Sequence, residues 1–298
     1  MLNRRDFVKV TGLLTGIGFT SVNGFARSLL QDDQYEVKML RGNVGIFTAR
    51  GGTVVWRIAE DGIAVVDTQF PPSAKQLIEE VKKRSERKID YVINTHHHGD
   101  HSSGNIEFKG LADKIVAHAN SKENQRNSAE KNGKLDEILL PDTTFDKTWK
   151  ARLGSEKITA TYFGPAHTNG DAIIHFENDN VAHMGDLHFH MRHPYIDKST
   201  GASIENWIKV LDAAIDKYDN ETIFVSGHAE PVNDLTGGKD RLRSKNAYLN
   251  TLLEVVGKEI KSGKSKEEIE KLPAIPGFDF PERGLSRNLG TAYDELTA

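Results

Sequence analysis

A run of histidines directly after an apolar segment constrains this chain more than any other feature of its sequence. The strand-like segment YVINT continues into HHHGDH at residues 96–101, a pattern of the form H-x-H-x-D-H. Side chains two residues apart in an extended segment point to the same side, so His96 and His98 can face one metal ion. A turn then allows Asp100 and His101 to face a second ion. Imidazole nitrogens and carboxylate oxygens are ligands that zinc accepts without a thiolate.

Composition excludes several classes of protein. The 298-residue chain has no cysteine, so disulfides, thiolate-ligated zinc, iron–sulfur clusters and thiol nucleophiles are ruled out. Hydrophobic residues make up 37% and charged residues 28%, which is typical of a globular rather than a disordered chain. The formal net charge is −4 and no basic block occurs, so we expect no nucleic-acid partner.

Residues 1–26 have the features of an export signal. The basic segment NRRDFVK at residues 3–9 closely resembles the twin-arginine motif. The apolar stretch that follows, residues 10–22, is diluted by glycine and is too short for a stable membrane span. We predict cleavage after Ala26, with the twin-arginine export machinery as a partner. The mature protein would then be periplasmic or otherwise exported, without a stable membrane span.

Residues 27–298 are predicted to form a single domain that includes helices at its C-terminal end. Strands are predicted in two batches: 44–49, 53–58, 63–67, 91–95 and 114–117, then 157–162, 172–177, 181–184 and 222–226. Helices are predicted at about 120–139 and 203–218, after capping-box pairs at Ser73/Gln76 and Ser265/Glu268, and along the tail from 242 to 260. Each batch of strands is followed by helices, which favours two packed sheets with helices outside.

Three later strand ends carry further metal-ligand side chains beside a glycine. They are His167 in GPAHTNGD, Asp186 in MGDL and His228 in VSGHAEP. One such residue alone is a weak signal, because loop histidines are common. All three in this order, behind the first cluster, indicate a shared site.

With these motifs the chain resembles the metallo-β-lactamase superfamily, from the strand ending at Asp67 to His228. The resemblance implies an α+β fold, a four-layer αββα sandwich with a dinuclear site at one edge. It implies a zinc-dependent hydrolase that holds two Zn²⁺ ions, with iron or manganese as alternatives, and acts on a small-molecule substrate. The implied ligands are His96, His98 and His167 for the first ion, Asp100, His101 and His228 for the second, and Asp186 as a bridge. Asp67 and Asp171 are expected to orient the cluster from outside.

The implied chemistry is hydrolysis by a hydroxide that bridges the two metal ions, positioned by Asp100 and Asp186 as catalytic carboxylates. The bond cleaved stays open among ester, thioester, lactam and lactone. Asp186 is unusual for a β-lactamase with this motif, whereas Phe189 stands where lactonases carry tyrosine. Two alternatives remain: a β-lactamase acting on β-lactam antibiotics, and a non-catalytic periplasmic zinc-binding protein.

The remaining histidines receive simpler interpretations. Strand alternation predicts that His97 points away from the metal face. We expect structural or exposed positions for His118, His175 and His183. His188, His190 and His193 follow Asp186 closely and are expected at the rim of the site, where contact with substrate or proton transfer is an open alternative.

Overall fold

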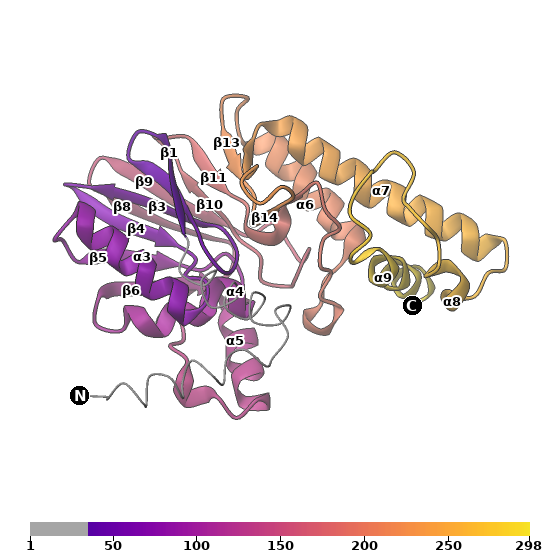
Figure 1. The fold of residues 1–298 in the computed structure, drawn as a ribbon, viewed down its shortest axis with the longest axis horizontal. Coiled ribbons are helices and arrows are strands. Elements are labelled where there is room, and N and C mark those ends of the chain that lie inside the picture. The colour runs from indigo at the N-terminus through magenta and orange to yellow at the C-terminus, as the bar shows by residue number, and fades with distance from the viewer. Residues whose placement is uncertain (1–34) are drawn as a thin grey trace, which may run out of the picture. The chain divides into compact units, whose positions relative to one another are not determined.

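A computed structural model describes residues 35–298, and the predicted export signal at residues 1–26 lies outside this range. Two β-sheets pack face to face, with helices on their outer faces (Figure 1). The strand order is β1-β2-β3-β4-β5-β6-β7 in the first sheet and β15-β13-β11-β10-β9-β8 in the second. The predicted four-layer αββα sandwich is confirmed. Within residues 35–298, no helix is both long and apolar enough to cross a bilayer.

The first sheet is antiparallel at its start and parallel from β4 onward. Its strands are β1 (Glu36–Arg41), β2 (Val44–Thr48), β3 (Val54–Ala59), β4 (Gly62–Val66), β5 (Ile89–Ile93), β6 (Ala112–His118) and β7 (Thr143–Phe145). Parallel neighbours need crossover connections. These contain α3 (Pro71–Arg84), α4 (Gly99–Ser102), η1 (Ser103–Phe108), α5 (Ala119–Lys131) and η2 (Leu135–Glu137).

The second sheet is mostly antiparallel, with one parallel pair, β11 and β13. Its strands are β8 (Thr148–Leu153), β9 (Glu156–Thr161), β10 (Ile173–Phe176), β11 (Val181–His183), β13 (Ile223–Val225) and β15 (Thr236–Gly237). A separate short pair consists of β12 (Phe189–His190) and β14 (His228–Ala229). The helical elements of this half are η3 (Gly185–Leu187), η4 (Lys198–Thr200), α6 (Ile204–Lys217), α7 (Lys239–Lys261), α8 (Lys266–Ile269) and α9 (Leu285–Thr297).

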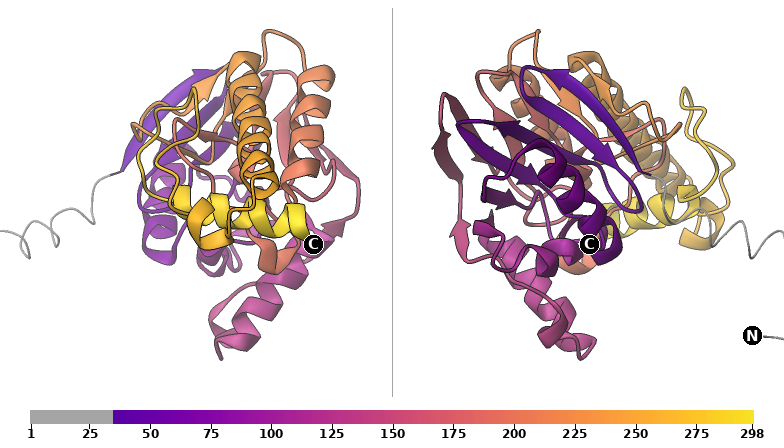
Figure 2. Two further views of the ribbon diagram at one scale, coloured as in Figure 1. Left: turned by 90° about the vertical axis from the view of Figure 1, so that its right-hand side faces the viewer. Right: turned by 60° about the vertical axis from the view of Figure 1, so that its left-hand side comes forward.

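Strand alternation explains why the sheets bury both faces. In β4, Ala64 and Val66 belong to the core between the sheets, while Ile63 and Val65 are fully buried on the opposite face. Figure 2 shows α3 lying against that outer face. A continuous apolar run of this kind is typical of a strand covered on both sides.

A second core lies between the second sheet and the C-terminal helices. Trp207 of α6 and Leu249 of α7 are fully buried there beside Ile173 of the sheet, and Leu289 of α9 belongs to the same core. The helix predicted at 203–218 is confirmed as α6, and Ser203 caps it by accepting a hydrogen bond from the Asn206 N–H. The tail of the chain therefore packs as part of the sandwich.

Three details of the sequence prediction are wrong. The capping box expected at Ser73 does not form, because α3 starts two residues earlier on Pro71 and the Ser73 hydroxyl donates to the Arg50 carbonyl. The helix expected over 120–139 ends at Lys131 and is followed by the short turn η2. Strand β8 was missed, because most of its side chains are not buried and its apolar signal is weak.

Candidate metal centre

The candidate ligands lie at one edge of the sandwich because several strands end there in the same direction. Strands β4 and β5 run parallel in the first sheet, and β11 and β13 run parallel in the second. Strand β9 is antiparallel to β10, which is antiparallel to β11, so β9 also ends at this edge. The residues that follow these ends are His96 after β5, His167 after β9, Asp186 after β11 and His228 after β13.

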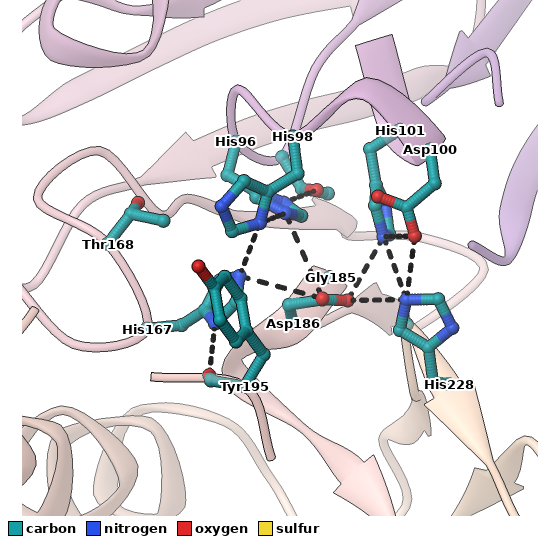
Figure 3. A network of polar contacts seen from close by, with 12 residues as sticks. His96, His98, Asp100, His101, His167, Thr168, Gly185, Asp186, Tyr195 and His228 are labelled. Atoms are coloured by element: carbon teal, nitrogen blue, oxygen red, sulfur yellow. Dashed lines mark hydrogen bonds and ion pairs between the residues drawn. The ribbon is translucent and has the colours of Figure 1, made fainter. Parts of the chain in front are cut away.

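Three histidines form the first cluster, which we call the three-histidine group: His96, His98 and His167. Nδ1 of His98 lies 3.2 Å from Nε2 of His96 and 2.9 Å from Nε2 of His167 (Figure 3). His96 and His167 are completely buried, whereas His98 is partly exposed. Three ring nitrogens from two separate loops thus converge on one point.

The second cluster, which we call the mixed group, contains Asp100, His101 and His228. Nε2 of His228 lies 3.1 Å from Oδ2 of Asp100 and 3.3 Å from Nε2 of His101. His101 is fully buried, but 30% of the Asp100 side chain and 18% of the His228 side chain are exposed. The mixed group is therefore the more accessible of the two.

Asp186 lies between the two groups and directs one oxygen to each (Figure 3). Its Oδ2 is 3.5 Å from Nε2 of His167 and 3.9 Å from Nε2 of His96. Its Oδ1 is 3.0 Å from Nε2 of His101 and 3.4 Å from Nε2 of His228. Oδ1 is buried and has no hydrogen-bond partner of good geometry within residues 35–298. A buried carboxylate oxygen that faces imidazole nitrogens is a chemically suitable ligand for a cation.

Contacts from outside determine which nitrogen of each histidine in the three-histidine group faces inward. Nδ1 of His167 lies 2.7 Å from the carbonyl oxygen of Tyr195, which only accepts, so Nδ1 carries the proton and Nε2 is bare. Nε2 of His98 lies 3.0 Å from the Asp197 carboxylate, which leaves Nδ1 bare. Nδ1 of His96 lies 3.0 Å from the hydroxyl of Thr95. Bare nitrogens that face one another at about 3 Å suit a shared cation.

Asp67 orients His101 of the mixed group in a similar way. Its Oδ2 lies 2.8 Å from Nδ1 of His101 and accepts from the Thr95 hydroxyl at 2.7 Å, and its Oδ1 accepts from the Thr95 N–H at 2.8 Å. The aspartate is fully buried and adopts φ +65°, a backbone conformation that costs free energy for a residue with a side chain. It occupies the orienting position predicted from the sequence. Asp171 instead accepts from the Thr168 N–H and hydroxyl and so stabilises the loop that carries His167.

Two glycines are needed because the ligands pack against bare backbone. A Cβ on Gly52 would lie 2.1 Å from the ring of His101, and a Cβ on Gly227 would lie 2.1 Å from Oδ1 of Asp186. Any side chain at either position would displace a candidate ligand. The backbone of the loops after β2 and β13 therefore lies close against the candidate ligands, which requires glycine at these two positions.

Two members of the three-histidine group, His96 and His167, have lowered pKa values that keep them neutral. Burial, followed by the neighbouring His98, lowers the pKa of His167 to about 3. Burial, followed by His101, lowers the pKa of His96 well below its usual value. Neutral imidazole is the form that ligates a metal ion, so neither of these histidines has to lose a proton first.

The mixed group is charged instead. Burial opposes a charge on His228, but Asp186 and Asp100 outweigh it and raise its pKa to about 9. Burial also opposes a charge on His101, yet Asp186, Asp100 and Asp67 raise its pKa well above the usual value. The same pairing lowers the pKa of Asp100 to about 2 in spite of its burial.

The remaining histidines lie outside these two groups. His97 is buried, and its Nε2 is 3.6 Å from the Asp197 carboxylate, so His97, His98 and Asp197 form a third small cluster behind the site. His188 contacts Ser226, His190 contacts Asp234 and His193 contacts the Tyr248 hydroxyl. Of the three histidines expected at the rim, His193 is the one that lines the pocket described next.

A pocket of about 930 Å³ opens onto both groups. His98, Asp100, Asp186 and His228 form its inner end, and the aromatic rings of Phe70, Phe189 and Tyr195 stand around them. The remaining wall carries arginines that the sequence analysis did not single out: Arg50, Arg192, Arg283 and Arg287. These residues and Asp197 carry no local motif, and only the folded chain brings them to the site.

Two facing sheets with paired histidine–carboxylate clusters at one edge define a class of metal-binding α+β proteins. The model of the metallo-β-lactamase superfamily matches residues 49–228, which include every candidate ligand. The chain belongs to the metallo-β-lactamase superfamily. Family membership and the two clusters together support a metal-dependent hydrolase.

Individual relatives are distant. The chain is 23% identical over 231 residues to the type 2 metallo-β-lactamase of Elizabethkingia meningoseptica, covering 72% of this chain and 86% of that protein. It is 26% identical over 181 residues to the metallo-β-lactamase IND-1 of Chryseobacterium indologenes, covering 59% and 71%.

Solved structures share the fold. The metallo-β-lactamase IND-7 aligns with a TM-score of 0.60 and 20% identity, over 73% of this chain and 99% of that one. A double mutant of the sec-alkyl sulfatase PisA1 aligns with a TM-score of 0.69 and 14% identity, over 89% of this chain and 50% of that one.

Proposed function

We propose that this protein is an exported hydrolase that holds two zinc ions and cleaves an ester, thioester, lactam or lactone bond. His96, His98 and His167 would hold one ion, and Asp100, His101 and His228 the other, with Asp186 shared between them. The observation that carries the proposal is the placement of Asp186, whose two oxygens face different groups. A carboxylate can span two cations in this way. Iron and manganese are also compatible with such a ligand set.

When bound, the ions would lower the pKa of water in the site toward neutrality and polarise the bond to be cleaved. Side chains of the protein would orient the attacking water, accept its proton and contact the substrate. Asp100 and Asp186 would orient the attacking water, and the partly exposed Oδ2 of Asp100 is placed to accept its proton. The rings of Phe70, Phe189 and Tyr195 line the pocket and offer apolar surface to a substrate.

A β-lactamase acting on β-lactam antibiotics is the second candidate. It is favoured by the relatives, because the curated proteins reported above are metallo-β-lactamases that match most of this chain. The position of Asp186 argues for the broader assignment, since a β-lactamase with this motif usually lacks the shared carboxylate. A β-lactamase should prefer lactams over esters, whereas the broader assignment does not require this preference.

Metal analysis combined with a substrate panel tests both. We expect two zinc ions per mature chain after reconstitution at neutral pH, and turnover of at least one member of a panel of lactams, esters, thioesters and lactones. Less than one ion per chain would overturn the metal assignment. Two ions without any turnover would support the alternative of a non-catalytic periplasmic zinc-binding protein.

Export through the twin-arginine route rests on the segment at residues 3–9. Because a receptor reads the paired arginines, we expect Arg4→Lys combined with Arg5→Lys to leave uncleaved protein in the cytoplasm. Cell fractionation with an unaltered control measures this. Normal periplasmic delivery of the double variant would contradict the route.

A further inference from the structure

The pocket that opens onto the candidate metal groups has a basic wall. Arg50, Arg192, Arg283 and Arg287 all line it, although the chain as a whole carries a net charge of −4. Within residues 35–298, no carboxylate forms an ion pair or a hydrogen bond with any of these four guanidinium groups. The carboxylates that line the pocket are Asp100 and Asp186, which the proposed function commits to metal.

Three of these guanidinium groups lie over aromatic rings of the pocket, within reach of a cation–π interaction. Arg192 lies 5.9 Å from the centre of the Phe189 ring, which is itself stacked on His228 at 5.4 Å. Arg287 lies 4.5 Å from the centre of the Tyr195 ring, which is 5.4 Å from the ring of His98. A cation–π interaction helps to hold a guanidinium in place and does not use up the N–H groups that can donate to a ligand.

Arg50 is held in the same way on the other side of the pocket, 5.6 Å from the centre of the Phe70 ring. The fourth arginine, Arg283, directly precedes Gly284, the residue before α9, and Gly284 also lines the pocket. No side chain caps this helix start and its first turn contains no acidic residue, so its N–H groups add to the positive potential there.

We propose that the four arginines bind an oxyanion group on the substrate, so that this enzyme acts on small anionic molecules. This inference rests on the proposed hydrolase function and narrows its substrate class. A sulfate, sulfonate, phosphate or carboxylate group has planar pairs of oxygens that match the forked N–H groups of arginine. One aromatic ring, Phe189, separates Arg192 from His228, and one ring, Tyr195, separates Arg287 from His98.

The C-terminal segment supplies two of the four charges. Arg283 and Arg287 lie beyond residue 228, where the match to the family model ends. The metal groups lie within the matched region and the basic wall extends outside it. Anion specificity would therefore depend in part on the C-terminal segment, which lies outside the range matched by the family model.

Calorimetry on the zinc-loaded mature protein tests the binding step. The probes are 4-nitrobenzenesulfonate, 4-nitrophenylphosphonate and 4-nitrobenzoate, with neutral 4-nitrobenzamide as the reference. We expect Arg287→Gln to weaken binding of the preferred anion about tenfold, and Arg192→Gln with Arg287→Gln about a hundredfold, with 4-nitrobenzamide unchanged. The order of the three anions identifies the kind of oxyanion. Arg243→Gln is the matched control, because Arg243 is exposed on α7 outside the pocket and its loss changes the net charge equally.

Kinetics with paired esters separates this inference from the hydrolase proposal. Phenyl acetate and 4-acetoxybenzenesulfonate contain the same acetate ester and differ in charge. We expect a lower KM for the sulfonate, which rises in the arginine variants while kcat changes little. Equal KM values for the two esters, or equal anion affinity in Arg287→Gln and Arg243→Gln, would contradict anion binding by the arginines. Neither result would contradict the proposed hydrolase function. Arg287-dependent anion binding by a zinc-loaded protein that turns over no member of the substrate panel would support the role of the arginines and overturn the hydrolase.

Discussion

The three-histidine group and the mixed group lie on either side of one carboxylate, yet they are built differently. The first has two fully buried histidines with lowered pKa values, His96 and His167, and each of its three histidines makes a second contact, with Thr95, Asp197 or the Tyr195 carbonyl. The second is partly exposed, contains a carboxylate, and has its histidines paired with acidic side chains. The comparison indicates one preorganised position suited to hold a metal ion tightly and one more exposed position that faces the pocket.

Loss of one histidine from the three-histidine group should have the largest effect. We expect His98→Ala to lower turnover by about 10³-fold or more and to reduce metal content, because several kcal/mol of catalysis depend on the metal. His97→Ala is the matched control, since its ring points to Asp197 and belongs to neither metal group. Metal analysis and initial rates measure both. Equal losses in the two variants would show that the loop is arranged differently.

Asp186→Asn should affect metal binding at the two groups differently. An amide keeps the shape of the carboxylate but bridges two cations poorly, so we expect turnover to fall at least ~10²-fold. The variant should fold, keep the ion of the three-histidine group and hold the other weakly. Metal titration followed by mass spectrometry counts the ions. Retention of both ions with near-normal turnover would remove Asp186 from the site and favour the β-lactamase alternative.

The two groups should respond differently to pH. The raised pKa of His101 and the pKa of about 9 for His228 mean that metal must displace protons from the mixed group. The pKa of about 3 for His167 means that this histidine has no proton to lose at neutral pH. We therefore expect affinity at the mixed group to fall about tenfold per pH unit for each histidine proton displaced, as the pH drops from 8 to 5.5. Equilibrium dialysis at each pH should show that the ion of the mixed group is lost first as the pH falls. Simultaneous loss of both ions would contradict the difference between the two groups.

The metal-free protein should show the opposite trend in its folding stability. The pKa of His228 is higher in the folded state, about 9, than the usual value of 6.5. Its ion pairs with Asp100 and Asp186 therefore stabilise the fold fully below pH ~6.5, and this contribution is lost as the pH rises through about 9. Urea denaturation of the chelator-treated protein between pH 6 and 10 measures the slope. A His228→Gln variant should lose the part of this slope that His228 contributes and keep the part from His101, whose pKa is also raised in the folded state.

The smallest expected effects come from the residues that orient the ligands. Asp67 accepts three donors on its two oxygens, so in Asp67→Asn the amide must point an N–H at a donor. Asp197→Asn is milder, because the Ser199 hydroxyl beside Asp197 can turn to accept. We expect metal affinity to fall ~100-fold at the mixed group for Asp67→Asn and ~10-fold at the three-histidine group for Asp197→Asn. Competition with a chelator measures both constants, and the reverse order would contradict this ranking.

Local sequence was sufficient wherever a short-range rule governs the structure. The spacing of His96 and His98 predicted that their rings share one point, and the capping box at Ser265 and Glu268 is present. Rules failed where two signals competed. Pro71 determines the start of α3 and overrides the nearby capping pattern, because its fixed φ suits the first helical turn and the Ser73 hydroxyl finds a backbone acceptor elsewhere.

The sequence by itself determined the types of ligand, their order along the chain and the layered fold, because these follow from strand periodicity and the chemistry of imidazole and carboxylate. Tertiary structure alone decided which nitrogen of each histidine faces inward, since Asp197 and the Tyr195 carbonyl reach His98 and His167 across many intervening residues. It also decided that Arg50 and Arg287 share one pocket. Contacts of this kind depend on how the two sheets and the C-terminal helices close over one edge, and no local pattern of residues encodes that closure.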